Sequence, residues 1–234
     1  MKAVYRTHKG NIRASNQDAV LFAPQNTLFA VADGMGGHNA GDIASRMTVE
    51  SVEASLSTAD FNDKNIIDAV RKANKEVYER QLSDTSLSGM GTTLALIWAQ
   101  DSKLLCANIG DSRVYLFRNN TLKRITRDHS IVQEMIESGV LTEEKARISP
   151  YRSCITRAIG TDETVETDIF SIDCSAGDRY LICSDGLTEH ISEARISEIM
   201  KYEQIEIAAD AFLNETLAAG GTDNVSFVIA EVSL

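Results

Sequence analysis

Five aspartates stand at junctions between short apolar segments and polar loops. They are Asp18, Asp33, Asp111, Asp185 and Asp223. Four of them lie beside a glycine or one residue from it, and a single Asp next to Gly is usually turn chemistry. Five together indicate more, because two packed sheets gather several strand ends at one edge. Carboxylates that cluster there cannot all stay ionised without counter-charge, so the pattern predicts bound divalent cations.

The stretch 31–42, VADGMGGHNAGD, carries Asp33 out of an apolar run with little side chain around it. A Walker-type phosphate loop requires Lys and Ser/Thr after its last glycine, whereas His38 follows here. The glycines also lack the spacing of a dinucleotide fingerprint. Two interpretations remain at this point, a flexible strand-to-helix turn and a metal-binding acid at a strand end.

The other potential ligands narrow the choice of metal. The four cysteines are Cys106, Cys154, Cys174 and Cys183. They form no CxxC pair and lie mostly in apolar runs, so we expect buried free thiols in a reducing compartment. Oxygen ligands without a Cys/His cluster favour Mg²⁺ or Mn²⁺ over zinc.

Composition sets further limits on the class of protein. The chain has 234 residues, 43% of them hydrophobic and 24% charged, as in ordinary globular proteins. The net charge of −11 argues against nucleic-acid binding and implies that an anionic substrate is recruited through bound cations. No apolar run reaches the roughly 18 residues of a membrane span, and the N-terminus shows no signal sequence. We therefore expect a cytoplasmic protein with no membrane or nucleic-acid partner.

The hydrophobic pattern predicts an α+β fold. Expected strands cover 3–7, 19–23, 28–32, 92–99, 103–109, 113–118, 179–184 and 224–232. Expected helices include one in which Ile43/Met47 and Val52/Leu56 are spaced i, i+4, and one with Ile66, Val70, Ala73 and Val77 on one face. A capping box of Ser130 and Gln133 opens a short helix, and a helical pair is expected across 192–219. Strands that follow one another without intervening helices exclude a doubly wound parallel sheet and indicate antiparallel sheets covered by helices.

Seven motifs occur in a fixed order along nearly the whole chain. They are RASNQD (13–18), VADGMGGH (31–38), GMGTTL (89–94), GDSRVY (110–115), TRDHS (126–130), CSDGL (183–187) and GTDNVS (221–226). In this order they resemble the metal-dependent Ser/Thr protein phosphatases of the PPM (type 2C) family, in its bacterial branch. The resemblance implies a β-sandwich of two antiparallel sheets flanked by helices on both sides. It also implies a single phosphatase domain over 1–234, with a flap subdomain at about 139–153.

The resemblance assigns roles to the aspartates. Asp33 becomes the carboxylate that bridges two metal ions, and Gly34 lends its backbone carbonyl to one of them. Asp185 and Asp223 hold the other ion. Asp18 acts near the centre, directly or through bound water, so Asp18 and Asp33 count as catalytic. The implied cofactors are two tightly bound Mn²⁺ or Mg²⁺ ions.

The resemblance also implies a phosphate-binding residue and a third metal site. Arg13 grips the substrate phosphate, a task that suits its planar guanidinium. Asp111, shared with Asp185, provides a third and weaker metal site. His38, in the loop that carries Asp33, is the candidate general acid. The paired threonines of GMGTTL and the motif TRDHS are interpreted as structural.

The implied activity is hydrolysis of phosphoserine and phosphothreonine in proteins by a metal-activated water. The expected partners are phosphoprotein substrates and a bacterial Ser/Thr kinase that the enzyme opposes, and the expected state is a monomer. One alternative is a catalytically silent binding module of the same fold, which would be expected to have lost metal-binding acids that are all present here. Another is a phosphatase dedicated to one regulatory protein, a question that the fold does not settle.

Overall fold

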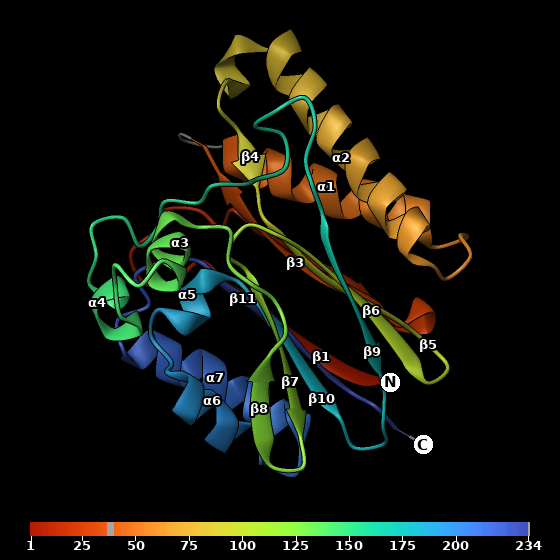
Figure 1. Cartoon of the computed structure of the whole chain (residues 1–234), viewed down its shortest axis with the longest axis vertical. Coiled ribbons are helices and arrows are strands. Elements are labelled where there is room, and N and C mark those ends of the chain that lie inside the picture. Colours follow the sequence, from red (N-terminus) through yellow and green to blue (C-terminus); the bar gives the residue numbers. More distant parts are fainter. Residues whose placement is uncertain (37–39, 234) are drawn as a thin grey trace.

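Two antiparallel sheets face each other, and helices cover the outer side of each (Figure 1). The computed structural model describes residues 1–36 and 40–233. The first sheet has the strand order β1-β11-β10-β7-β8. The second has the order β2-β3-β5-β6-β9, with β4 paired to β3. The predicted α+β sandwich of antiparallel sheets is confirmed.

The strands of both sheets are short. The first sheet consists of β1 (Lys2–His8), β7 (Arg113–Arg118), β8 (Thr121–Arg124), β10 (Arg179–Cys183) and β11 (Val225–Glu231). The second consists of β2 (Asp18–Ala23), β3 (Leu28–Met35), β4 (Gly91–Thr92), β5 (Leu94–Gln100), β6 (Lys103–Ile109) and β9 (Asp168–Asp173).

The helices lie outside the two sheets (Figure 1). They are α1 (Ala40–Leu56), α2 (Asp63–Ser83), α3 (Ile131–Glu137), α4 (Glu143–Arg147), α5 (Asp185–Thr188), α6 (Glu193–Ile199) and α7 (Ile205–Ala218). Two 3-10 turns cover Pro24–Asn26 and Thr85–Leu87. No helix in the described part of the chain is long and apolar enough to cross a membrane.

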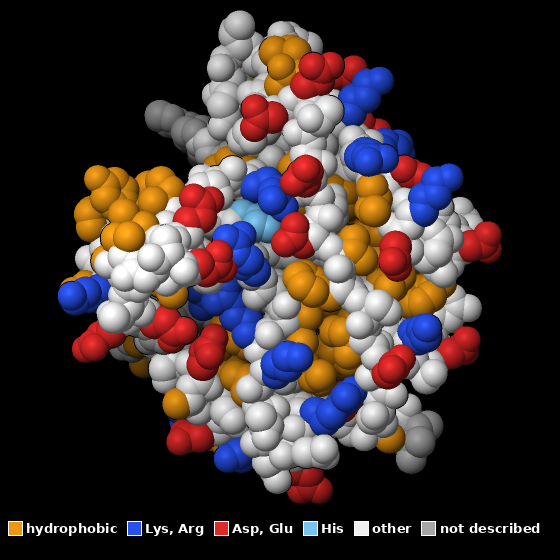
Figure 2. All heavy atoms as spheres, viewed as in Figure 1, with side chains coloured by type: hydrophobic (Ala, Val, Ile, Leu, Met, Phe, Trp, Pro, Cys, Tyr) orange, Lys and Arg blue, Asp and Glu red, His pale blue; other side chains and the backbone are white. Residues whose placement is uncertain are grey.

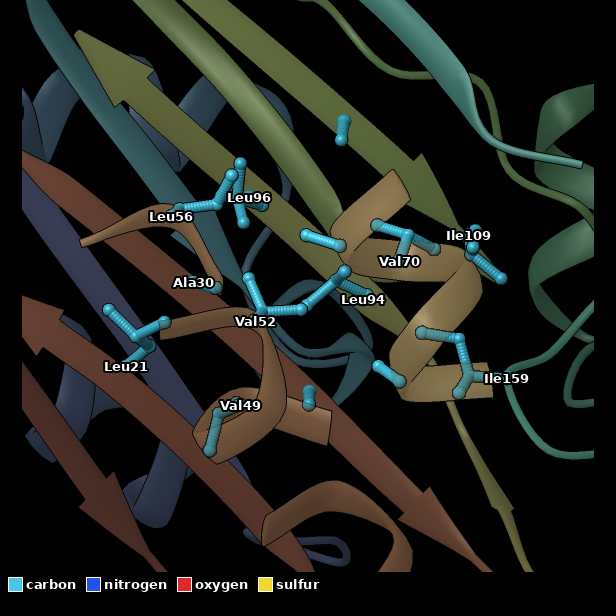
Figure 3. Packing of buried hydrophobic residues seen from close by; sticks show 14 of the residues in the cluster. Leu21, Ala30, Val49, Val52, Leu56, Val70, Leu94, Leu96, Ile109 and Ile159 are labelled. Atoms are coloured by element: carbon cyan, nitrogen blue, oxygen red, sulfur yellow. The ribbon is translucent and has the colours of Figure 1, made fainter. Parts of the chain in front are cut away.

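Three hydrophobic layers hold the sandwich together. In β3, Leu28 and Ala30 pack toward α1 and α2, whereas Phe29 and Val31 pack between the sheets. Successive side chains of a strand point to opposite faces, so a strand buried on both faces reads as one continuous apolar run. Figure 3 shows the outer layer, where Val52 of α1 and Val70 of α2 lie close to strand residues such as Leu94. A third layer joins the other sheet to α6 and α7.

The helices that were predicted from a strong periodicity of apolar residues are confirmed. In α2, Ile66, Val70, Ala73 and Val77 are all buried, and the side chain of Asn62 caps the first turn. Ser130 caps α3 by accepting a hydrogen bond from the backbone N–H of Gln133 at 3.3 Å. The side chain of Gln133 bonds Glu137 at 3.0 Å, so only half of the predicted capping box forms.

Several boundaries differ from the prediction. The strand expected at 28–32 continues to Met35, because β4 pairs with its end, so Asp33 lies inside the strand. The strand expected at 92–99 is divided at Thr93 into β4 and β5. The sequence pattern does not predict strands β8 and β9 or helices α4 and α5, and α4 lies in the segment 139–153, for which the family resemblance implies a flap.

The cysteines are free, as expected. Cys106 and Cys183 are buried, whereas Cys154 and Cys174 are only half-buried.

Candidate active site

The five predicted aspartates come together at one end of the sandwich. Four of them, Asp33, Asp111, Asp185 and Asp223, line one pocket of about 240 Å³. Each comes from a different strand end: Asp33 near the end of β3, Asp111 after β6, Asp185 after β10 and Asp223 before β11. Asp18, the first residue of β2, pairs directly with Asp33 across the antiparallel ladder. The convergence predicted from the strand ends is therefore present.

Other residues line the pocket as well. Besides the four aspartates it is lined by Arg13, Gln17, Gly34, Met35, Gly36, Thr93, Ser153, Ile155 and Asn224. Ser153 and Ile155 belong to the segment that follows α4, so this segment reaches the acids. His38, the candidate general acid, lies outside the described residues.

Backbone contacts hold Asp33 in place. The Asp33 N–H donates to Thr93 Oγ1 at 2.9 Å, and the Asp33 carbonyl accepts from the Thr93 N–H at 2.9 Å. The hydroxyl of Thr92 donates to the same carbonyl at 2.8 Å. The threonine pair of GMGTTL thus fixes the strand that presents the Asp33 carboxylate.

Gly34 occupies a place where no side chain fits. A Cβ at this position would lie 2.1 Å from the carbonyl oxygen of Gly41 and 2.5 Å from that of Gln17. Its N–H donates to the Gln17 carbonyl at 3.1 Å. Close packing of α1 and the N-terminal loop against Gly34 explains the glycine next to Asp33.

Asn224 anchors the N-terminal loop that carries Arg13. Its Nδ2 donates to the carbonyls of Lys9 at 3.0 Å and Ser15 at 2.9 Å, and its Oδ1 accepts from the Gln17 N–H at 2.8 Å. The Arg13 guanidinium then reaches Asp223 Oδ2 at 2.7 Å. Sequence reasoning missed this anchor, although Asn224 follows Asp223 directly in the motif GTDNVS.

Ser184 is a second residue that the sequence analysis did not single out. Its hydroxyl is buried and donates to Asp18 Oδ2 at 2.9 Å, while accepting from the Ser226 N–H at 3.0 Å. It therefore connects Asp18 to the last strand. The available signal was its position directly before Asp185 in CSDGL.

The acids are strongly perturbed because the protein shields them from water and brings them close to one another. Loss of solvation raises the pKa of Asp18 to about 7 and that of Asp185 to about 6. For Asp33 and Asp111, loss of solvation and then neighbouring carboxylates raise the pKa well above its ordinary value. The carboxyl groups of Asp18 and Asp185 are among the neighbours that raise the pKa of Asp33.

The donor set fits a hard divalent cation. Asp18 Oδ1 and Asp185 Oδ1 are enclosed and have no hydrogen-bond partner in the structure. Around them lie carboxylate oxygens, the ligands that Mg²⁺ and Mn²⁺ prefer. Within the described residues no three acidic, histidine or cysteine side chains already converge as a closed ligand set. In place of such a set, Asp223 pairs with Arg13.

A buried histidine secures the loop before Asp111. His129 Nδ1 accepts from the Gly110 N–H at 3.0 Å, and its backbone N–H donates to the Gly110 carbonyl at 2.9 Å. Its Nε2 lies 3.1 Å from Asp168, which Arg157 also contacts at 2.7 Å. Burial lowers the pKa of His129, so the ring is neutral and its Nδ1 is free to accept.

The chain is similar to known protein phosphatases. The family model described as Protein phosphatase 2C matches residues 8–220. The Serine/threonine phosphatase stp of Listeria innocua is 36% identical over 244 aligned residues, covering 100% of this chain and 97% of that protein. The Serine/threonine protein phosphatase PstP of Mycobacterium tuberculosis is 37% identical over 97% of this chain, which spans 44% of PstP.

Solved structures agree with this similarity. A crystal structure of Mycobacterium tuberculosis PstP has a TM-score of 0.94 with 36% identity, covering 100% of this chain and 99% of that one. The catalytic domain of PstP crystallised with two manganese ions has a TM-score of 0.92 with 35% identity, covering 100% and 98%.

Proposed function

We propose the following roles for these residues from the premise that the chain belongs to the protein phosphatase 2C family and is a bacterial-type protein serine/threonine phosphatase. The acid pocket is its active site, and the pocket acids hold two divalent cations, Mn²⁺ or Mg²⁺. The observation that carries this proposal is the group of acids with raised pKa, two of which present enclosed and unpartnered oxygens. Such a group gains charge balance from cations.

Each acid has a share in holding the ions. Asp33 would contact both, with the Gly34 carbonyl completing one coordination sphere, while Asp185 and Asp223 would hold the other ion. Asp18 accepts a hydrogen bond from Ser184 and pairs with Asp33 across the ladder. It would act near the two ions, directly or through bound water. Asp111 with Asp185 would hold a third and weaker ion. When bound, the cations supply positive charge to the phosphoryl oxygens and lower the pKa of a coordinated water.

Arg13 is proposed to bind the substrate phosphate. Its side chain is 54% exposed and lies at the pocket, 2.7 Å from Asp223. A phosphate dianion offers the guanidinium two oxygens in its plane, so arrival of the substrate would exchange the contact with Asp223 for one with the phosphate. A cation that Asp223 already holds would favour the same exchange, because it takes the place of the guanidinium. For the proton that the leaving hydroxyl requires, the proposed donor remains His38.

The proposed setting is cytoplasmic. The enzyme would act there as a monomer on phosphoproteins and oppose a Ser/Thr kinase. Residues 1–234 would form one phosphatase domain, with 139–153 as the flap. Support for the flap comes from α4 and from Ser153, which lines the pocket.

The test is removal and return of the metal. Turnover of a small aryl phosphate and of a phosphothreonine peptide should vanish in excess chelator and return with Mn²⁺ or Mg²⁺. Calorimetric titration with Mn²⁺ should give two tight sites in the wild type and fewer in Asp185→Asn. A matched control is Asp173→Asn, an exposed acid at the far end of β9, which should bind like the wild type. Undiminished turnover in excess chelator would refute the metal-based proposal.

A further inference from the structure

One polar side chain of α2 lies on the buried face of that helix. Asn74 is 1% exposed, although the residues buried with it, such as Val70, Ala73 and Val77, are apolar. The outer face of α2 carries exposed ion pairs, and Figure 2 shows charged side chains of both signs where Figure 1 places this helix. Enclosing an amide costs free energy unless its donors and its acceptor are bonded. The position of Asn74 therefore requires a compensating set of hydrogen bonds.

The partners of Asn74 are backbone groups of the segment 160–163. Its Oδ1 accepts from the Gly160 N–H at 2.8 Å. Its Nδ2 donates to the carbonyls of Asp162 and Glu163, each at 3.1 Å. This segment belongs to no helix or strand. One side chain of α2 thus supplies hydrogen bonds that a regular element would otherwise provide.

Gly160 lies where a side chain would collide with α2. Its φ is +87°, a conformation that favours glycine, and a Cβ there would lie 2.3 Å from Cγ1 of Val77. Gln81, two turns after Asn74, donates to the Gly160 carbonyl and accepts from the Gly89 N–H at 2.9 Å. Three side chains of α2 therefore fix the position of Gly160.

The residue before Gly160 connects this contact to the active site. The Ile159 N–H donates to the Thr92 carbonyl at 2.8 Å, and the Ile159 carbonyl accepts from the Thr92 N–H at 3.0 Å. Figure 3 shows the side chain of Ile159 close to α2. The hydroxyl of Thr92 donates to the Asp33 carbonyl at 2.8 Å. An unbroken series of contacts thus runs from Asn74 to Asp33.

Other residues of the pocket do not depend on this series. Asp185 and Asp223 stand at the ends of β10 and β11, in the first sheet, and Asn224 anchors the loop of Arg13 on the same side. Helix α2 instead packs on the second sheet, to which Asp33 belongs. A loosened contact with α2 would therefore move Asp33 relative to the acids of the first sheet.

We propose that Asn74 is a positioning residue for Asp33. It touches neither the pocket nor a substrate, and it acts through the backbone of Ile159 and Thr92. This inference rests on the proposed function, since Asp33 must contact the cations. Its effect falls on kcat and on the affinity for Mn²⁺. KM for a small aryl phosphate is little affected, because the loop that carries the phosphate-binding arginine is anchored elsewhere.

The first experiment measures kinetics and metal binding of Asn74→Ala, well below its thermal midpoint. Its kcat on the aryl phosphate in saturating Mn²⁺ should fall roughly 10- to 100-fold, as for loss of a supporting contact, with KM changed less than about 2-fold. Calorimetry should show Mn²⁺ bound roughly 10-fold more weakly. The control is Ile66→Ala, a buried position more than two turns earlier on α2. It should lower the thermal midpoint similarly, because it leaves a cavity, yet keep kcat and the affinity for Mn²⁺.

The second experiment needs neither metal nor substrate. Hydrogen exchange in chelator should be faster at the Thr92 and Ile159 amides of Asn74→Ala than in the wild type, because the bridge between them loses its support. Ile66→Ala should not show this local difference. Gln81→Ala removes the other side-chain bond to Gly160 at a half-buried position, so it should fold and lower kcat several-fold with KM unchanged.

The outcomes separate the hypotheses. Wild-type kcat and Mn²⁺ affinity in Asn74→Ala would overturn the positioning role. So would equal losses in Ile66→Ala, because the effect would then follow stability alone. If Asn74→Ala does not fold, wild-type kcat and wild-type exchange in Gln81→Ala would overturn it. Absence of metal-dependent turnover in the wild type would instead overturn the proposed function.

Discussion

Asp128 and the pocket acids are enclosed carboxylates at the same end of the sandwich, and their surroundings neutralise them in different ways. Asp128 is 4% exposed and is bound by Arg113 through contacts of 2.7 and 3.1 Å and by Arg124. The pocket acids, in the described part of the chain, share one ion pair, that of Asp223 with Arg13. A buried carboxylate that is paired with arginines stabilises the fold, whereas buried carboxylates without such partners suit the cations proposed above.

The largest effect expected from this contrast is on activity. Asp33→Asn removes a proposed bridging ligand while keeping the side-chain volume, and Thr92 and Thr93 hold the backbone independently of the carboxylate. Turnover should fall by more than the roughly 100-fold that loss of an outer-sphere partner costs. The thermal midpoint in chelator should not fall. Near-normal turnover would place Asp33 among ordinary strand residues.

The opposite pattern is expected for Asp128→Asn. This change leaves Arg113 and Arg124 without their common anion, so it should lower the free energy of unfolding by about 3 kcal/mol. For a chain of this size that corresponds to a thermal midpoint lower by roughly 6 to 12 °C. The folded fraction should keep its affinity for Mn²⁺. If Asp128→Asn left the stability unchanged and abolished metal binding, Asp128 would belong with the pocket acids and the contrast drawn here would be wrong.

The pH dependence of stability sharpens the contrast further. The pKa values of Asp18 (about 7) and Asp185 (about 6) lie above those of an unfolded chain, so the folded protein holds more protons between roughly pH 5 and 7. The free energy of unfolding in chelator should therefore fall as the pH rises through this window. Added Mn²⁺ should reverse the fall most strongly at pH 7.5, because cations bind the deprotonated acids.

A matched variant isolates the acids in this measurement. His129, whose pKa burial lowers, acts in the opposite direction below about pH 6.5 and is common to both proteins. Asp18→Asn should have a flatter profile in chelator than the wild type. The measurement is the thermal midpoint from pH 5 to 7.5, and identical slopes would show that Asp18 does not carry the effect.

The parts predicted from sequence were those with local signals. Strands β6 and β7 match their predicted ranges to the residue, because each is a buried apolar run, and the turn at Asn119 and Asn120 ends β7. Strand β9 was missed because it is an edge strand that pairs with β6 alone and exposes Ser171 and Asp173. Half-exposed edges give a weak apolar pattern.

The residues of the site also fall into those that a local sequence signal marks and those that it does not. The aspartates were predicted because motif order and strand ends mark them locally. Their supports were not, because a contact such as Ser184 to Asp18 joins residues 166 positions apart and leaves no pattern in either segment. The link from His129 to Gly110 is of the same kind, since it depends on how β6 and α3 meet.

The smallest effect is expected at Asp111, where the two kinds of carboxylate meet. Its loop is held without the side chain: Gly110 is bound by His129, and Ser112 Oγ is 2.7 Å from Thr93 Oγ1. Asp111→Asn should therefore fold normally. If Asp111 helps to hold a third ion, that ion has few protein ligands, and the Mn²⁺ concentration for half-maximal turnover should rise by roughly 10-fold. Asp101→Asn, in the hairpin between β5 and β6, is the control. The measurement is a metal titration of activity with both substrates. Curves that superimpose for all three proteins would make Asp111 a turn residue of the connection between β6 and β7, and the centre would then hold two metal ions and no third.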